Sequence, residues 1–105
     1  MDFSKITSIG EGGLAYCASL TCDNFGAITS VDNSGFYNCV SLENTSLDNI
    51  TSIGNSAFYN CTNLKLESFG KVASLNNSAF YGCISCTFKE NSMNRALRLW
   101  FQDAD

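Results

Sequence analysis

Residues 50–71 read ITSIGNSAFYNCTNLKLESFGK, and this pattern recurs along the chain every 22 residues. The units begin at Ile6, Ile28, Ile50 and Val72, where the chain reads ITSIG, ITSVD, ITSIG and VASLN. Three further columns keep the same phase: Leu14, Phe36, Phe58 and Phe80; Cys17, Cys39, Cys61 and Cys83; and Leu20, Leu42, Leu64 and Cys86. Apolar residues locked to a fixed period of this length predict a repeat solenoid, in which each unit buries its apolar face against its neighbours.

The apolar positions within one unit are spaced too irregularly for a long helix or a continuous strand. They predict a coil with a short strand at 50–53, a tight helical or 3₁₀ turn at 56–61, and a second short strand at 64–67. Stacking the coils would pair these strands in parallel. We therefore expect short parallel strands joined by short helical turns.

Length and composition indicate one small domain over residues 1–105. Hydrophobic residues make up 45% of the chain and charged residues only 15%, with a net charge of -4. The few basic residues are scattered, which argues against a nucleic-acid partner. The opening MDFSKITSIGEGG resembles no secretory signal, and no stretch is apolar enough for membrane insertion. The expected location is cytoplasmic for the chain as written, and extracellular or at the cell surface if it is a piece of a longer protein.

The cysteine column is best interpreted as packing, since a free cysteine behaves as a small buried hydrophobe. Cys83 and Cys86 form a CxxC pair, for which a redox dithiol, a disulfide or half of a zinc site are the alternatives. The chain has no histidine and no second CxxC, so no metal site is predicted.

The repeat resembles the BspA-like class of leucine-rich repeats, whose units read ITSIG, two variable residues, AF, a spacer, C, two residues and L. ITSIGNSAFYNCTNL at 50–64 follows this pattern throughout, and ITSVDNSGFYNCVSL at 28–42 departs from it at three positions. The resemblance covers about residues 3–91, and the chain lacks the proline that such units commonly carry. It implies a right-handed leucine-rich-repeat-like coil with a parallel sheet along one face. It also implies an association with microbial surface proteins, adhesion and protein binding.

The two ends of the array are expected to differ. Phe3 lies one period before Phe25, so the chain starts within a unit and its first coil lacks an evident polar cap. Residues 92–103 are predicted to form a C-terminal amphipathic capping helix, because apolar residues recur at helical spacing. That stripe consists of Met93, Ala96, Leu97, Trp100 and Phe101. The alternative is that Trp100 and Phe101 form a docking surface.

Outward positions form polar and aromatic columns. Glu43 and Lys65 share a column on the predicted second strand, and Glu67 lies in the next outward column. Tyrosines follow the core phenylalanines, in a row expected to end at Ala15, and either bind a partner or pack on one another. An asparagine column at 33, 55 and 77 is expected to bond the backbone. The predicted partner-binding residues are Tyr37, Tyr59, Tyr81, Glu43, Lys65, Glu67, Trp100 and Phe101.

No arrangement of residues indicates catalysis or a cofactor, because no nucleophile stands beside an identifiable base and no loop would cradle phosphate. Two functions remain. The first is a non-enzymatic protein-recognition or adhesion module that binds a protein partner through its polar sheet face. The alternative is a structural subunit that associates with itself or a larger complex through the ends of the solenoid.

Overall fold

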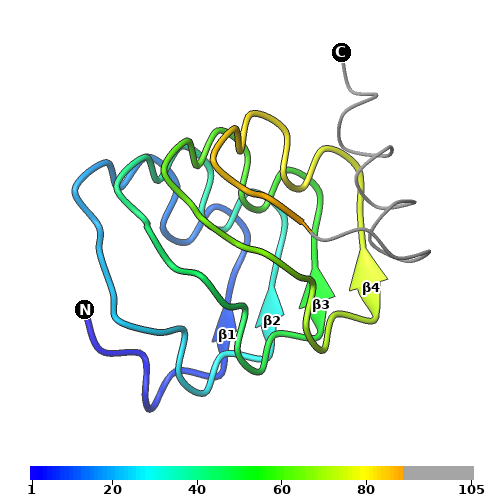
Figure 1. The fold of residues 1–105 in the computed structure, drawn as a ribbon. Helices are drawn as coiled ribbons and strands as arrows, with labels where there is room; N and C mark the ends of the chain where they lie inside the picture. Colours follow the sequence, from blue (N-terminus) through cyan, green and yellow to red (C-terminus); the bar gives the residue numbers. More distant parts are fainter. Residues whose placement is uncertain (89–105) are drawn as a thin grey trace.

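The computed structural model describes residues 1–88, which form a stack of four coils (Figure 1). Each coil contributes one two-residue strand, and the four strands pair in parallel in the order of the sequence. The strands are β1 Ser8–Ile9, β2 Ser30–Val31, β3 Ser52–Ile53 and β4 Ser74–Leu75. Ser8 pairs with Ser30, and Ser30 with Ser52, so the sequence period is also the spatial period. The predicted solenoid with short parallel strands is confirmed.

Backbone hydrogen bonds join the coils in two opposite directions. Beside the sheet, a later coil donates to an earlier one, as in the 2.8 Å bond from Gly54 N–H to the Val31 carbonyl. At the following turn the direction reverses, and Phe36 N–H donates to the Ala57 carbonyl of the next coil at 2.7 Å. Successive coils are therefore tied together on two sides of each unit.

The turn at 56–61 is not helical, contrary to the sequence-based expectation, and no helix occurs within residues 1–88. Bonds between residues three apart do form, such as Tyr59 N–H to the Ser56 carbonyl at 3.1 Å. However, Ser56 and Asn60 have φ values of 56° and 62°, in the left-handed region that interrupts a right-handed helix. Alternate N–H groups then point at the next coil instead of along a helix axis.

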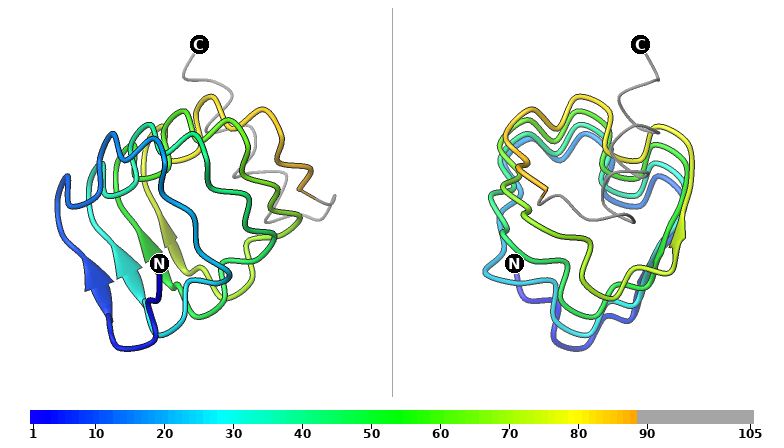
Figure 2. Two further views of the ribbon diagram at one scale, coloured as in Figure 1. Left: turned by 90° about the vertical axis from the view of Figure 1, so that its left-hand side faces the viewer. Right: turned by 45° about the vertical axis from the view of Figure 1, so that its right-hand side comes forward.

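The second predicted strand, at 64–67, is also wrong. The segment is extended and lies across the coil from the sheet (Figure 2). Lys65 N–H of this segment donates to the Asn44 carbonyl of the preceding coil at 3.0 Å, and Thr87 N–H of the following coil donates to the Leu66 carbonyl at 2.9 Å. Single bonds of this kind do not make the continuous ladder that defines a strand.

The core is a set of columns that follow the stacking direction. The rings of Phe36 and Phe58 are stacked at 5.2 Å, and those of Phe58 and Phe80 at 5.3 Å. Phe3 is buried as well, and its ring meets that of Phe36 edge-on at 6.1 Å. The phenylalanine at the start of the chain therefore belongs to the core.

The cysteine column packs inside the solenoid, as predicted, and its thiols also donate hydrogen bonds. Cys39 Sγ donates to the Leu14 carbonyl at 3.1 Å, and Cys61 Sγ donates to the Phe36 carbonyl at 3.1 Å. Both side chains are fully buried, and all six cysteines are free thiols. Burial, reinforced by the neighbouring Cys61 thiol, raises the pKa of Cys39 to about 12.

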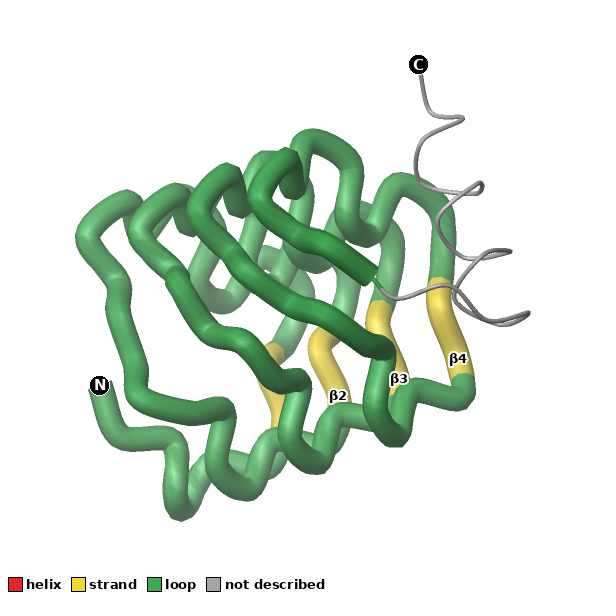
Figure 3. The backbone as a smooth tube through the Cα atoms, in the orientation of Figure 1, coloured by secondary structure: helices red, strands yellow, loops and turns green. Residues whose placement is uncertain are grey.

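The tube view displays the regularity of the described coils, in which strands occupy one side and loops the rest (Figure 3). The predicted helix at 92–103, with Trp100 and Phe101, lies outside the described residues. Within residues 1–88 there is no helix long and apolar enough to cross a membrane.

Candidate recognition surfaces

A shallow groove of about 370 Å³ lies over β1, β2 and β3, and we call it the strand groove. Its lining is mostly polar and comes from all four coils. The lining residues are Ser8, Ile9, Gly10, Ser30, Val31, Asp32, Asn33, Ser52, Gly54 and Asn76. Sequence reasoning missed this surface because it placed the binding face on the second strand, which does not form.

The hollow shape of the groove comes from one column in which glycines alternate with larger polar side chains. The column consists of Gly10, Asp32, Gly54 and Asn76. A Cβ atom on Gly10 would meet nothing within 4 Å, so the space above it is open. Asp32 is exposed and is the one charged residue that lines the groove. This alternation, readable in the sequence, is the signal that could have located the groove.

The walls of the groove are fixed by side-chain hydrogen bonds. Asp32 Oδ1 accepts the Asn33 N–H at 2.7 Å, and Asn76 Nδ2 donates to the Ile53 carbonyl at 3.0 Å. Asn33 Oδ1 accepts the Asn55 N–H at 2.8 Å, and Asn55 Oδ1 accepts the Asn77 N–H at 3.1 Å. The predicted role of the asparagine column in bonding the backbone is confirmed.

The predicted tyrosine row forms, and its rings stack on one another. Tyr37 and Tyr59 are 4.7 Å apart with an interplanar angle of 2°, and Tyr59 and Tyr81 are 5.0 Å apart with an angle of 22°. Partial burial raises the pKa of Tyr37, and the neighbouring phenols of Tyr16 and Tyr59 add to the effect. Because neighbouring faces cover each other, the row offers mainly ring edges and hydroxyl groups to a partner.

The polar columns with Glu43, Lys65 and Glu67 are exposed, but they lie on the arm opposite the strands. The structure therefore separates them from the strand groove. Among residues 1–88, Glu43, Lys65 and Glu67 all lie outside the four-stranded sheet.

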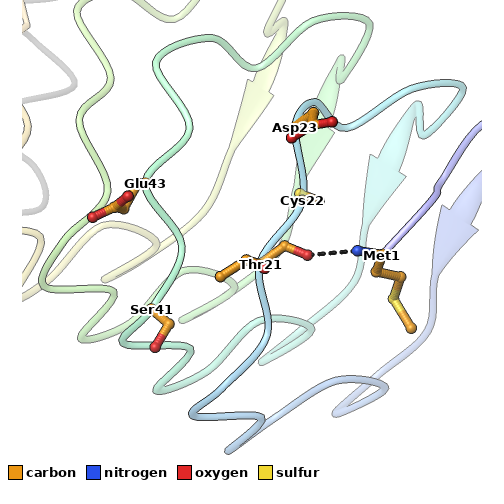
Figure 4. A pocket seen from close by; sticks show the side chains of 6 residues that line it. All are labelled: Met1, Thr21, Cys22, Asp23, Ser41 and Glu43. Carbon is orange, nitrogen blue, oxygen red and sulfur yellow. Dashed lines mark hydrogen bonds between the residues drawn. The ribbon is translucent and has the colours of Figure 1, made fainter.

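A smaller pocket of about 230 Å³ lies between the first two coils, on the arm that carries Glu43 (Figure 4). It is lined by Met1, Thr21, Cys22, Asp23, Ser41 and Glu43. The Met1 amino group donates to the Thr21 carbonyl at 2.8 Å. Burial raises the pKa of the Cys22 thiol, which exchanges hydrogen bonds with the buried Asn44 amide. A raised pKa keeps this thiol in its unreactive neutral form.

None of these surfaces has the chemistry of a metal centre. Within the described part of the chain, no three cysteine, aspartate or glutamate side chains are grouped so that they could hold a metal ion. The chain also has no histidine. What the surfaces offer is hydrogen-bonding groups and ring edges on a regular backbone.

Comparison with known proteins agrees with this architecture. The family profile described as BspA type leucine-rich repeat region, with six copies, matches residues 2–97. Leucine-rich repeat families are typically non-enzymatic and commonly mediate protein interactions. Neither the curated proteins nor the solved structures give a match. Because the match spans nearly the whole chain, this protein belongs to the family of BspA-type leucine-rich repeat proteins.

Proposed function

We propose that this chain is a non-enzymatic recognition module that binds a protein partner across the strand groove. The observation that carries the proposal is a polar groove of about 370 Å³ built on consecutive, in-register coils. Hydroxyl, amide and carboxylate groups are held there on backbone that is already hydrogen-bonded to its neighbours. Such preorganised groups lose little conformational entropy when a partner binds.

The charge of the groove favours a partner that brings a cation to Asp32. That carboxylate stands alone among hydroxyl and amide groups, and the whole chain carries a net charge of -4. A complementary lysine or arginine on the partner would gain a charge-assisted hydrogen bond. An adhesion-type role, as the resemblance implies, would use this same contact in a longer surface protein.

The tyrosine row and the columns with Glu43, Lys65 and Glu67 are the competing surfaces for the same partner. Stacking already uses the ring faces of Tyr37, Tyr59 and Tyr81, which leaves less area to bury. We propose these residues, together with Trp100 and Phe101, as partner contacts only after the strand groove.

The test places a photo-crosslinking amino acid at one position on each surface: Ser30 in the strand groove, Tyr59 in the row, and Lys65 on the opposite arm. Each full-length chain is irradiated in an extract of the source cells, and the products are identified by mass spectrometry. We expect one discrete protein adduct from position 30, lost when Asp32→Lys is added to a chain that still folds. An adduct from position 65 or 59 without one from position 30 would contradict the choice of surface. The absence of any discrete adduct would contradict the recognition role.

A second candidate function, a structural subunit, is favoured by the first coil. Ile6 is 37% exposed, whereas its equivalents in the next two coils, Ile28 and Ile50, are fully buried. Apolar side chains exposed on a coil favour packing against another chain. Light scattering over a hundredfold dilution separates the two functions. A mass near 11.4 kDa throughout supports recognition by a monomer, and a larger mass that Ile6→Asp reduces supports assembly.

A further inference from the structure

The fourth coil differs from the other three in the turn that follows the cysteine column. Where the earlier coils place Leu20, Leu42 and Leu64, the fourth places Cys86. The turn is closed by a hydrogen bond from Cys86 N–H to the Cys83 carbonyl at 3.2 Å. Closure of this kind brings the two Cα atoms within about 7 Å. Disulfides span Cα separations of about 4.4–6.8 Å, so a bridge fits this turn.

Both cysteines are free thiols, and each donates a hydrogen bond to the third coil. Cys83 Sγ donates to the Phe58 carbonyl at 3.0 Å, and Cys86 Sγ donates to the Leu64 carbonyl at 3.4 Å. Both side chains therefore face the same neighbouring coil from one closed turn.

Access to the two thiols is unequal in a way that suits stepwise oxidation. Cys86 is partly exposed, whereas Cys83 is 5% exposed and the column members Cys39 and Cys61 are fully buried. The neighbouring Cys83 thiol lowers the pKa of Cys86, while the Cys61 and Cys86 thiols, together with burial, raise the pKa of Cys83. The outer sulfur is thus the one prepared to attack a reagent from solvent.

We propose that Cys83 and Cys86 are a reversible redox modification site, at which a low-molecular-weight disulfide such as oxidised glutathione converts the pair to an intramolecular disulfide. The Cys86 thiolate attacks one sulfur of the small disulfide, so that a mixed disulfide forms on Cys86 and one small thiolate leaves. The Cys83 thiol then gives its proton to solvent and attacks the Cys86 sulfur, which expels the second small thiolate. The chain loses two electrons and two protons, and the small disulfide becomes two thiols once the leaving thiolates take up protons.

Oxidation would change the packing of the fourth coil. The bridge removes the S–H donors that Phe58 and Leu64 carbonyls now accept, so the last described coil loses two of its bonds to the third coil. The site therefore links the redox state of the surroundings to the strength of one coil–coil interface.

The test uses the full chain, folded and reduced, in buffers of increasing oxidised-to-reduced glutathione ratio. The reaction is stopped with acid, the chain is unfolded, and free thiols are alkylated and counted by mass. We expect the number of alkyl groups to fall from six to four, with Cys83 and Cys86 joined in one peptide. Cys83→Ser should instead accumulate glutathione on Cys86, because the resolving thiol is missing.

Cys86→Leu is the matched control, since it restores the residue that the other coils carry at this position. It should keep all five of its remaining thiols at ratios that bridge the wild-type chain. Retention of six thiols by the wild type, or a bridge that joins any other pair, would overturn the proposal. Because the decisive measurement is the peptide map of the wild-type chain, misfolding of a variant would leave the test intact.

Discussion

The ring of Tyr16 lies 5.3 Å from that of Tyr37, although the two residues are not equivalent in the repeat. The equivalent of Tyr37 in the first coil is Ala15, where the tyrosine row was expected to end. Tyr16 stands one position later, with a φ of 65°, and its ring is tilted by 54° against that of Tyr37. A neighbouring position therefore supplies the ring that the periodic position lacks, and the row has four members.

Each tyrosine of the row is expected to stabilise the solenoid in proportion to the number of rings that it contacts. Tyr59 stacks on two neighbours, whereas Tyr16 contacts one neighbour at a tilt. Aromatic pairs contribute about 0.5–1.5 kcal/mol beyond their buried area, so Tyr59→Ala should cost roughly twice as much as Tyr16→Ala. Urea unfolding followed by circular dichroism measures both free energies.

The control is Ile84→Ala, because Ile84 is 82% exposed and its truncation should cost almost nothing. If Tyr59→Ala proves as mild as Ile84→Ala, the stacked rings make no measurable contribution.

Two glycines of the strand groove are expected to respond oppositely to the same substitution. A Cβ atom at Gly54 would lie 2.6 Å from both the backbone nitrogen and Oδ1 of Asn33, which is too close for any real contact. Gly54→Ala should therefore displace the asparagine column and destabilise the chain by about 1–3 kcal/mol. Gly10→Ala meets open space and should change the midpoint of thermal unfolding little. Equal effects of the two substitutions would contradict the described packing of the groove.

The phenylalanine column should be most sensitive at Phe58, which stacks between Phe36 and Phe80. Phe58→Ala removes a fully buried ring and should cost about 3–5 kcal/mol, a large share of the stability of a small domain. Phe58→Leu should cost less, because Leu14 occupies the same position in the first coil. Denaturant unfolding of both variants checks the order, and a Leu variant as unstable as the Ala variant would contradict it.

The sequence was sufficient to predict the solenoid, its period and its core columns, because burial in a solenoid recurs with the repeat. Every column that the sequence marked as apolar supplies buried residues in the second and third coils, as Phe36 and Leu64 illustrate. The cysteine column was also assigned correctly, since a buried thiol with a carbonyl partner packs like a small hydrophobe.

The form of the turn and the place of the binding face were not predictable in the same way. Ser56 and Asn60 have backbone angles in the left-handed region, which lets their N–H groups bond to the next coil. The spacing of apolar residues within one unit contains no information about hydrogen bonds between units. The strand groove likewise arises from one column read across coils, in which Gly54 lies between Asp32 and Asn76. Reasoning along one unit missed it.

Burial of the Cys39 thiol is expected to make the free energy of unfolding fall at alkaline pH. An unfolded Cys39 thiol loses its proton near the ordinary value of 9.0, whereas the folded thiol holds its proton until about pH 12. Between these values the unfolded chain binds fewer protons than the folded chain, so the free energy of unfolding falls as pH rises. The slope contributed by one such thiol is up to about 1.4 kcal/mol per pH unit, and it ends once the folded thiol also ionises. Urea unfolding of the wild type and of Cys39→Ala at intervals from pH 8 to pH 11 isolates this contribution, because lysine and tyrosine titrations are common to both chains. We expect the wild type to lose stability more steeply above pH 9, and parallel curves would show that the folded Cys39 thiol ionises as readily as an exposed one.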